Sequence, residues 1–140
     1  MIGPVWALLA FAIWTIAVLM FGIGVLRWSK ILTGRAKLRD FPGDEPHGSD
    51  FYRRISRAHA NCVENLPVFG AIVVSAVAAG AASPLMNALS AGVVVARICQ
   101  TALHVASGAN AAIAVRFAFF ALQVAAFVAM AVVIVAKATA

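Results

Sequence analysis

Four polar residues in the middle of the sequence have the spacing of one helical face. Arg57, Asn61 and Glu64 stand at i, i+4 and i+7, and a helix turns by about 100° per residue, so these side chains lie on one side. Arg54 lies close to the same face one turn earlier. An arginine fork can bind a carboxylate, and a glutamate can bind an ammonium group. This face therefore has the chemistry to bind a charged small molecule.

Two further arginines, Arg97 and Arg116, interrupt apolar sequence later in the chain. A charge at membrane depth costs about 2.5 to 3.5 kcal/mol even on a lenient scale, so it needs a partner or a role. One interpretation is that the arginines and Glu64 form buried ion pairs that stabilise the fold. The excess of guanidinium groups over one carboxylate favours the other interpretation, an anionic ligand with carboxylates for the arginines and an amino group for Glu64.

The elements that must position these residues are membrane-spanning helices. The 140-residue chain is 64% hydrophobic and 11% charged, whereas a soluble domain has roughly 25% charged residues. Residues 4–26 contain no charge, and about 20 residues rising about 1.5 Å each cross the hydrocarbon core. We therefore expect an all-α membrane protein, a single four-helix bundle over residues 1–140. Its expected spans are 4–26, 51–82, 85–106 and 115–136.

The basic residues predict the orientation of the bundle. Eight of the eleven lysines and arginines lie between Arg27 and Arg57, in the long loop after the first span and its flanks. Such a cluster beside apolar spans is typical of a cytoplasmic loop that contacts anionic lipid head groups, and it argues against nucleic acid as a partner. We expect this loop to be cytoplasmic, both termini to be on the other side, and the membrane to be the inner membrane of a bacterium.

The cysteines and histidines do not predict a metal site. Cys62 and Cys99 stand in largely apolar helical sequence without a metal-type spacing, so we interpret them as small apolar core residues. His59 points away from the polar face by helical angle, and we expect it to be structural. His104 is likewise expected to be a packed or lipid-interface residue.

The segment RAHANCVENLPVF, from Arg57 to Phe69, resembles the signature of the membrane-associated proteins in eicosanoid and glutathione metabolism, the MAPEG family. The resemblance covers nearly the whole chain in layout, with four spans, a long basic first loop, a charged start of the second helix and an arginine in the fourth. It implies a homotrimer in which three sites between subunits, near the cytoplasmic face, each hold glutathione as cosubstrate.

The resemblance also implies roles for individual residues. Arg116 falls where the family places an arginine that stabilises the glutathione thiolate, which makes it the candidate catalytic residue. Glu64 would take the γ-glutamyl ammonium group and Arg57 a carboxylate. The candidate glutathione-binding residues are Arg57, Asn61, Glu64, Arg54, Lys37, Arg39 and Arg97.

Several family members carry a tyrosine one turn after the arginine of the fourth helix, where this sequence has Phe120. The leading interpretation is a membrane-bound glutathione-dependent transferase or peroxidase that acts on hydrophobic electrophiles. A catalytically silent lipid- or ligand-binding scaffold of the same family is the alternative. A small proton-coupled transporter is disfavoured because the first span has no acidic residue, and a membrane anchor without a ligand stays open.

Overall fold

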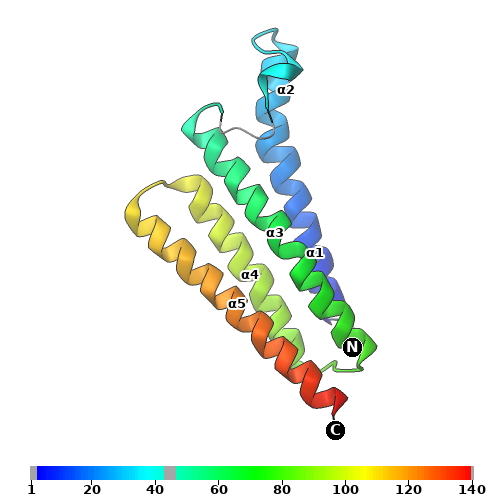
Figure 1. The fold of residues 1–140 in the computed structure, drawn as a ribbon. Helices are drawn as coiled ribbons and strands as arrows, with labels where there is room; N and C mark the ends of the chain where they lie inside the picture. Colours follow the sequence, from blue (N-terminus) through cyan, green and yellow to red (C-terminus); the bar gives the residue numbers. More distant parts are fainter. Residues whose placement is uncertain (1–2, 43–46, 140) are drawn as a thin grey trace.

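The computed structural model describes residues 3–42 and 47–139, which form four long helices (Figure 1). Each is long and apolar enough to cross a membrane, so the protein is an integral, multi-pass, all-α membrane protein. The first long helix consists of α1 (Gly3–Ala17), the π-helix η1 (Val18–Gly24) and α2 (Val25–Leu32). A 3-10 turn, η2 (Leu38–Asp40), precedes α3 (Asp50–Ala78), α4 (Pro84–Ala106) and α5 (Asn110–Ala138).

Successive helices run in opposite directions. Both termini lie at one end of the molecule with the short turn between α3 and α4, and the two other connections lie at the opposite end (Figure 1). α4 packs against α1, α3 and α5. We refer to the end that holds residues 33–49 and 107–109 as the loop end.

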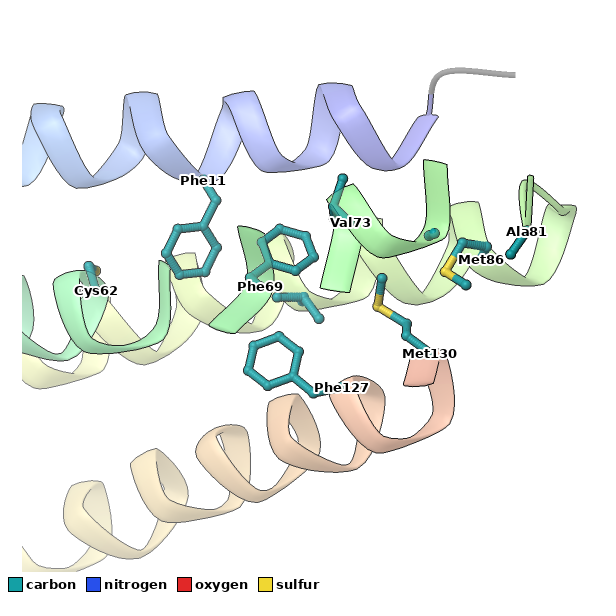
Figure 2. Close-up of a cluster of buried hydrophobic side chains, with 10 residues drawn as sticks. Phe11, Cys62, Phe69, Val73, Ala81, Met86, Phe127 and Met130 are labelled. Carbon is teal, nitrogen blue, oxygen red and sulfur yellow. The ribbon is translucent and has the colours of Figure 1, made fainter. Parts of the chain in front are cut away.

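The main core lies nearer the termini than the loop end and is built from aromatic and sulfur-containing side chains (Figure 2). Phe69 of α3 packs between Phe11 and Phe127, with ring centroids 5.6 Å and 5.9 Å apart. Met86 and Met130 are fully buried beside them. Close packing of this kind is what holds helices together in lipid, where the hydrophobic effect between helices is weak.

The helix limits differ from the expected spans. The first helix continues to Leu32 instead of residue 26, α3 ends at Ala78 instead of residue 82, and α5 begins at Asn110 instead of residue 115. Apolar residues mark only the lipid-contacting part of a helix, and polar residues continue the same backbone hydrogen bonding beyond it. The earlier start of α5 places Arg116 in the second turn of that helix.

Candidate functional site

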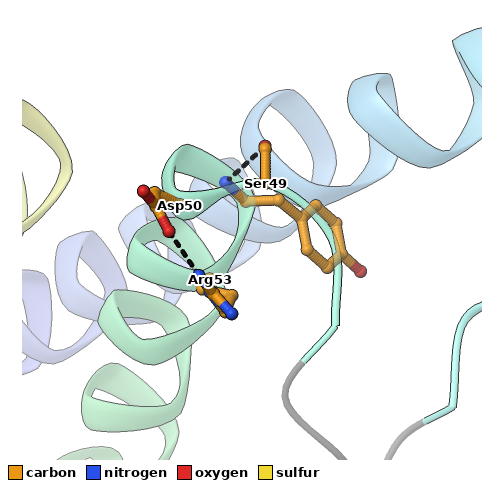
Figure 3. Close-up of polar contacts among 4 residues, drawn as sticks. Ser49, Asp50 and Arg53 are labelled. Carbon is orange, nitrogen blue, oxygen red and sulfur yellow. Dashed lines mark hydrogen bonds and ion pairs between the residues drawn. The ribbon is translucent and has the colours of Figure 1, made fainter.

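The start of α3 is fixed by two local contacts at the loop end. Ser49 is the N-cap residue, and its hydroxyl accepts a hydrogen bond of 3.3 Å from the Tyr52 backbone N–H. Asp50 forms an ion pair with Arg53 in the first turn (Figure 3). These contacts fix where the polar first turns of α3 begin.

A pocket of about 350 Å³ opens between these turns of α3, the last turn of α4 and the second turn of α5. We call it the arginine pocket. Its lining residues are Asp50, Arg53, Arg54, Arg57, His104, Gly108, Ile113 and Arg116. Four guanidinium groups therefore converge from two helices on one opening near the loop end.

The positive charge of the arginine pocket is only partly neutralised. Asp50 is its only carboxylate and pairs with Arg53. Arg54 Nε donates to the Val105 carbonyl oxygen at 3.1 Å, while Arg57 and Arg116 have no ion pair within 4.0 Å to a carboxylate in residues 3–42 or 47–139. The pocket can therefore take an anion, and arginine forks favour one that carries carboxylates.

The backbone at Arg116 accepts a hydrogen bond from one of two buried glutamines between α4 and α5. Gln100 Nε2 of α4 donates to the Arg116 carbonyl oxygen at 3.1 Å. Gln123 Nε2 donates to Gln100 Oε1 at 3.1 Å and to the Phe119 carbonyl oxygen at 3.0 Å. The glutamines tie α5 to α4 next to the pocket.

Asn61 and Glu64 lie outside the arginine pocket, farther along α3 toward its apolar half. Asn61 is half-buried and Glu64 is exposed. No ion pair within 4.0 Å involves Glu64 in the described part of the chain. The expected face of α3 therefore continues from the pocket along an exposed side of the chain.

The structure places Arg97 in the core of the helix bundle. Its side chain is 1% exposed, and its Cζ atom lies 5.4 Å from the centroid of the Phe11 ring. Among the described residues, neither Nε nor Nη2 has a hydrogen-bond partner. No ion pair within 4.0 Å involves Arg97 in the described part of the chain. Arg97 is not brought together with Arg57 and Arg116.

Lys37 and Arg39 are also outside the arginine pocket. Both are exposed around η2, where the Asp40 carboxylate accepts a hydrogen bond of 2.8 Å from the Lys37 backbone N–H. The Arg39 side chain lies 4.0 Å from Asp40. The short turn thus places two cations at the loop end, after the C-terminal end of α2.

His104 and Arg53 line the pocket although neither was a sequence-based site candidate. His104 was expected to be packed, and it is buried at 9% exposure, but it also faces Arg57 and Arg116 across the pocket. The spacing of His104 seven residues after Arg97 did not predict that it lines the pocket. The two side chains lie on the same side of α4, but Arg97 lies in the core and His104 lies at the pocket.

The MAPEG family model matches residues 4–136 of this chain. The chain belongs to the MAPEG family. No curated protein and no solved structure matches it significantly. MAPEG proteins are membrane transferases and synthases of glutathione-related metabolism, commonly use glutathione and are often trimeric.

In this MAPEG chain, the hydroxyl group that several family members place beside the fourth-helix arginine is absent. Phe120 lies one turn after Arg116 and is 41% exposed. The only tyrosine of the chain, Tyr52, is buried and accepts a hydrogen bond from Arg27. A thiolate in the arginine pocket would therefore depend on guanidinium groups and not on a tyrosine hydroxyl.

Proposed function

We propose that this protein is a membrane-bound glutathione-dependent transferase that also reduces lipid hydroperoxides and acts on hydrophobic electrophiles. The observation that carries the proposal is the convergence of Arg57 and Arg116, both without ion pairs to described carboxylates, on an open pocket. Ion pairing of these arginines with Glu64 in a closed interior would have argued for a purely structural role. Family membership supplies the class of ligand.

In the proposed mechanism, Arg116 stabilises the thiolate of bound glutathione. A free thiol is mostly protonated at neutral pH, and an adjacent guanidinium group favours its anion. The thiol proton goes to solvent, and the thiolate sulfur forms a bond to the electrophilic carbon as the leaving group departs with its electron pair. With a hydroperoxide, the thiolate attacks the terminal oxygen, the O–O bond breaks to give the sulfenic acid of glutathione, and the departing alkoxide takes a proton from solvent to become an alcohol. A second glutathione then converts the sulfenic acid to glutathione disulfide and water.

Arg54 and Arg57 would bind carboxylates of the tripeptide at the mouth of the pocket. Asn61 and Glu64 lie on the open side of α3, where a neighbouring subunit of a homotrimer could complete the site and Glu64 could take the γ-glutamyl ammonium group. Lys37 and Arg39 would reach the second carboxylate from the loop of that neighbour. Arg97 is buried in the core, so we assign it no contact to the ligand.

The proposed location is the inner membrane of a bacterium, with the arginine pocket at the cytoplasmic side. Glutathione would enter from water, and the apolar electrophile would enter laterally from the bilayer. The lipid therefore serves as the reservoir of the second substrate.

The test is glutathione-dependent conjugation of chlorodinitrobenzene by the purified protein. Arg116→Gln should lower kcat/KM on the order of 100-fold, because an electrostatic contact to the reacting anion is lost. Lys137→Gln, on the same helix at the opposite end, should leave the rate unchanged. The transferase proposal fails if calorimetry detects no glutathione binding to the unmodified protein. Binding without turnover would support the scaffold alternative.

A further inference from the structure

A second and larger pocket, of about 450 Å³, lies on the other side of α3. We call it the apolar groove. Its lining residues are Trp14, Ala17, Val18, Phe21, Gly22, Ile55, Thr101, Ala102, Val105 and Ala106. The volume is within the range of small-molecule sites, and Thr101 is the only lining residue with a polar side chain apart from the Trp14 indole.

The π-helix η1 forms one wall of this groove. Gly22 lies so close to α3 that a Cβ atom added there would be 2.2 Å from Ile55 Cδ1. Trp14 Nε1 donates to Thr101 Oγ1 at 3.4 Å, so the indole N–H is satisfied at the wall opposite. The glycine contact and the indole hydrogen bond hold the first helix against α3 and α4 on either side of the opening.

The apolar groove is separated from the arginine pocket by the contact between α3 and α4. Arg54 lines the pocket and Ile55 the groove, and Arg54 Nε bonds to the carbonyl oxygen of Val105, a groove residue. An occupant of the groove would therefore lie across the α3–α4 contact from Arg116 of the same chain. We therefore consider an occupant other than the electrophile.

A cation lies toward the loop end from the groove, at what we call its rim, although it is not one of the lining residues. Arg27 Nε donates to the Tyr52 hydroxyl, and its Cζ atom lies 5.4 Å from the Phe41 ring centroid. Tyr52 precedes Ile55 by three residues on α3, a rise of about 5 Å. The other guanidinium nitrogens have no hydrogen bond or ion pair to residues 3–42 or 47–139.

The depth of Arg27 matches the head-group region of a membrane. Trp28 is 55% exposed next to it, and Trp residues concentrate at the membrane interface. Lys30 follows on the same helix and is exposed. The rim is therefore basic at the level where lipid phosphates lie, above a groove that is apolar at the level of the acyl chains.

We propose that the apolar groove binds one acyl chain of an anionic phospholipid whose phosphate is bound by Arg27. The acyl chain lies against Phe21, Ala102 and Ala106. The negative head group faces the two guanidinium nitrogens of Arg27 that do not bond to Tyr52. This site is independent of glutathione, and its failure would leave the proposed transferase activity untouched.

Trp14 provides a direct probe because it lines the groove. Trp6 and Trp28 are 59% and 55% exposed, so both can be changed to Phe to leave Trp14 as the sole tryptophan. The variant with Trp14 alone is placed in phosphatidylcholine vesicles that contain a minor fraction of a brominated lipid. This lipid is either phosphatidylglycerol or phosphatidylcholine, and both have the same brominated acyl chains. Quenching of Trp14 then measures occupancy of the groove by each lipid.

We expect roughly fivefold tighter binding of brominated phosphatidylglycerol than of brominated phosphatidylcholine, the contribution of one basic contact. Arg27→Gln should remove this preference, and the matched control Lys137→Gln should retain it. Ala102→Phe should reduce quenching by both lipids because the ring fills the groove. Ala106→Phe serves the same purpose if the first variant does not fold.

Three results would overturn the proposal. The first is equal quenching of Trp14 by both lipids in the protein with Trp14 as its sole tryptophan, or a preference for phosphatidylglycerol that remains after Arg27→Gln. The second is that no brominated lipid quenches Trp14 and that the Ala102→Cys variant forms a disulfide between two copies of the chain. This result would show that a second copy covers the groove. The third is displacement of brominated phosphatidylglycerol by chlorodinitrobenzene, which would assign the groove to the electrophile.

Discussion

The unpaired arginines of this protein lie in two different surroundings. Arg57 and Arg116 line an open pocket, where water or a ligand can satisfy their donors. Arg97 is 1% exposed, and among the described residues two of its nitrogens have no hydrogen-bond partner. An unsatisfied buried donor costs about 1 to 3 kcal/mol, so the same residue type is useful at the pocket and costly in the core.

The cost of Arg97 predicts the effect of replacing it with an apolar side chain of similar length. Arg97→Met should leave the stability unchanged or raise it by up to about 3 kcal/mol, because buried ionic groups can be replaced by apolar ones at little cost. The loss of the Arg97–Phe11 contact, worth about 0.5 to 2 kcal/mol, works against this gain. Thermal unfolding in detergent measures the net effect.

Met130→Ala is the control, since it removes a fully buried side chain of the main core. It should lower the stability by about 2 to 5 kcal/mol. A loss of that size for Arg97→Met would contradict the prediction and would mean that Arg97 is paired in the assembled protein.

At the residue scale, helical periodicity predicted the side of α3 but not the depth of each side chain. Arg54 and Arg57 lie together as their spacing indicates, and both line the pocket. Arg97 could not be placed, because its direction depends on the rotation of α4 against α1, which brings the guanidinium over Phe11. His104 enters the pocket for the same reason.

At the element scale, the contact between α4 and α5 decides where Arg116 lies. Gln100 and Gln123 are buried at 6% and 0% exposure. Through Gln100 the pair holds the carbonyl oxygen of Arg116. We infer that these glutamines are positioning residues, which act on the site through Arg116 and do not touch the ligand.

Paired substitutions separate positioning from stability. Gln123→Leu removes the donor to Gln100 Oε1 and should destabilise the protein by about 1 to 3 kcal/mol. Adding Gln100→Leu should recover most of this loss, since replacing both partners with apolar groups can be nearly neutral. The double variant should still turn over glutathione on the order of tenfold more slowly, because Arg116 is less well placed.

The measurements are thermal unfolding and chlorodinitrobenzene turnover of the single and double variants. Simple addition of the two losses of stability would show that the glutamines do not act as a pair. Full turnover by the double variant would show that the Arg116 backbone needs no such support.

The sequence predicted the existence and order of the four helices because long apolar runs have few other structures in a membrane. It did not predict η1. A π-helix depends on tertiary contacts, here the close approach of Gly22 to Ile55, and the composition of 18–24 is that of any apolar span. The early start of α5 was missed because its N-cap residue is Ala109, which makes no side-chain cap hydrogen bond, and because Ser107, Gly108 and Asn110 are residue types typical of a loop.

At the scale of the whole molecule, the basic residues are separated along the bundle axis. Ten of the eleven lysines and arginines lie outside the core, since Arg97 alone is buried. Of these ten, Lys137 belongs to the end with the termini, and the other nine lie toward the loop end. The turn between α3 and α4 has no charged residue.

This separation predicts that the loop end faces the cytoplasm, because basic residues near short loops remain on that side. Alkaline phosphatase fused after Thr139 should therefore be active in a bacterial host, and a green fluorescent protein fused there should not fluoresce. A fluorescent protein inserted at Gly34, in the loop expected to be cytoplasmic, should fluoresce. Gly34 is a suitable insertion point because no atom would lie within 4 Å of a Cβ atom there. As a control, changing Arg35, Lys37 and Arg39 to Gln and adding lysines to the α3–α4 turn should weaken the preference of the loop end for the cytoplasm.

A fluorescent C-terminal fusion of the unmodified protein would contradict this orientation. It would place the arginine pocket on the side away from cytoplasmic glutathione, and the proposed supply of that cosubstrate would then be wrong.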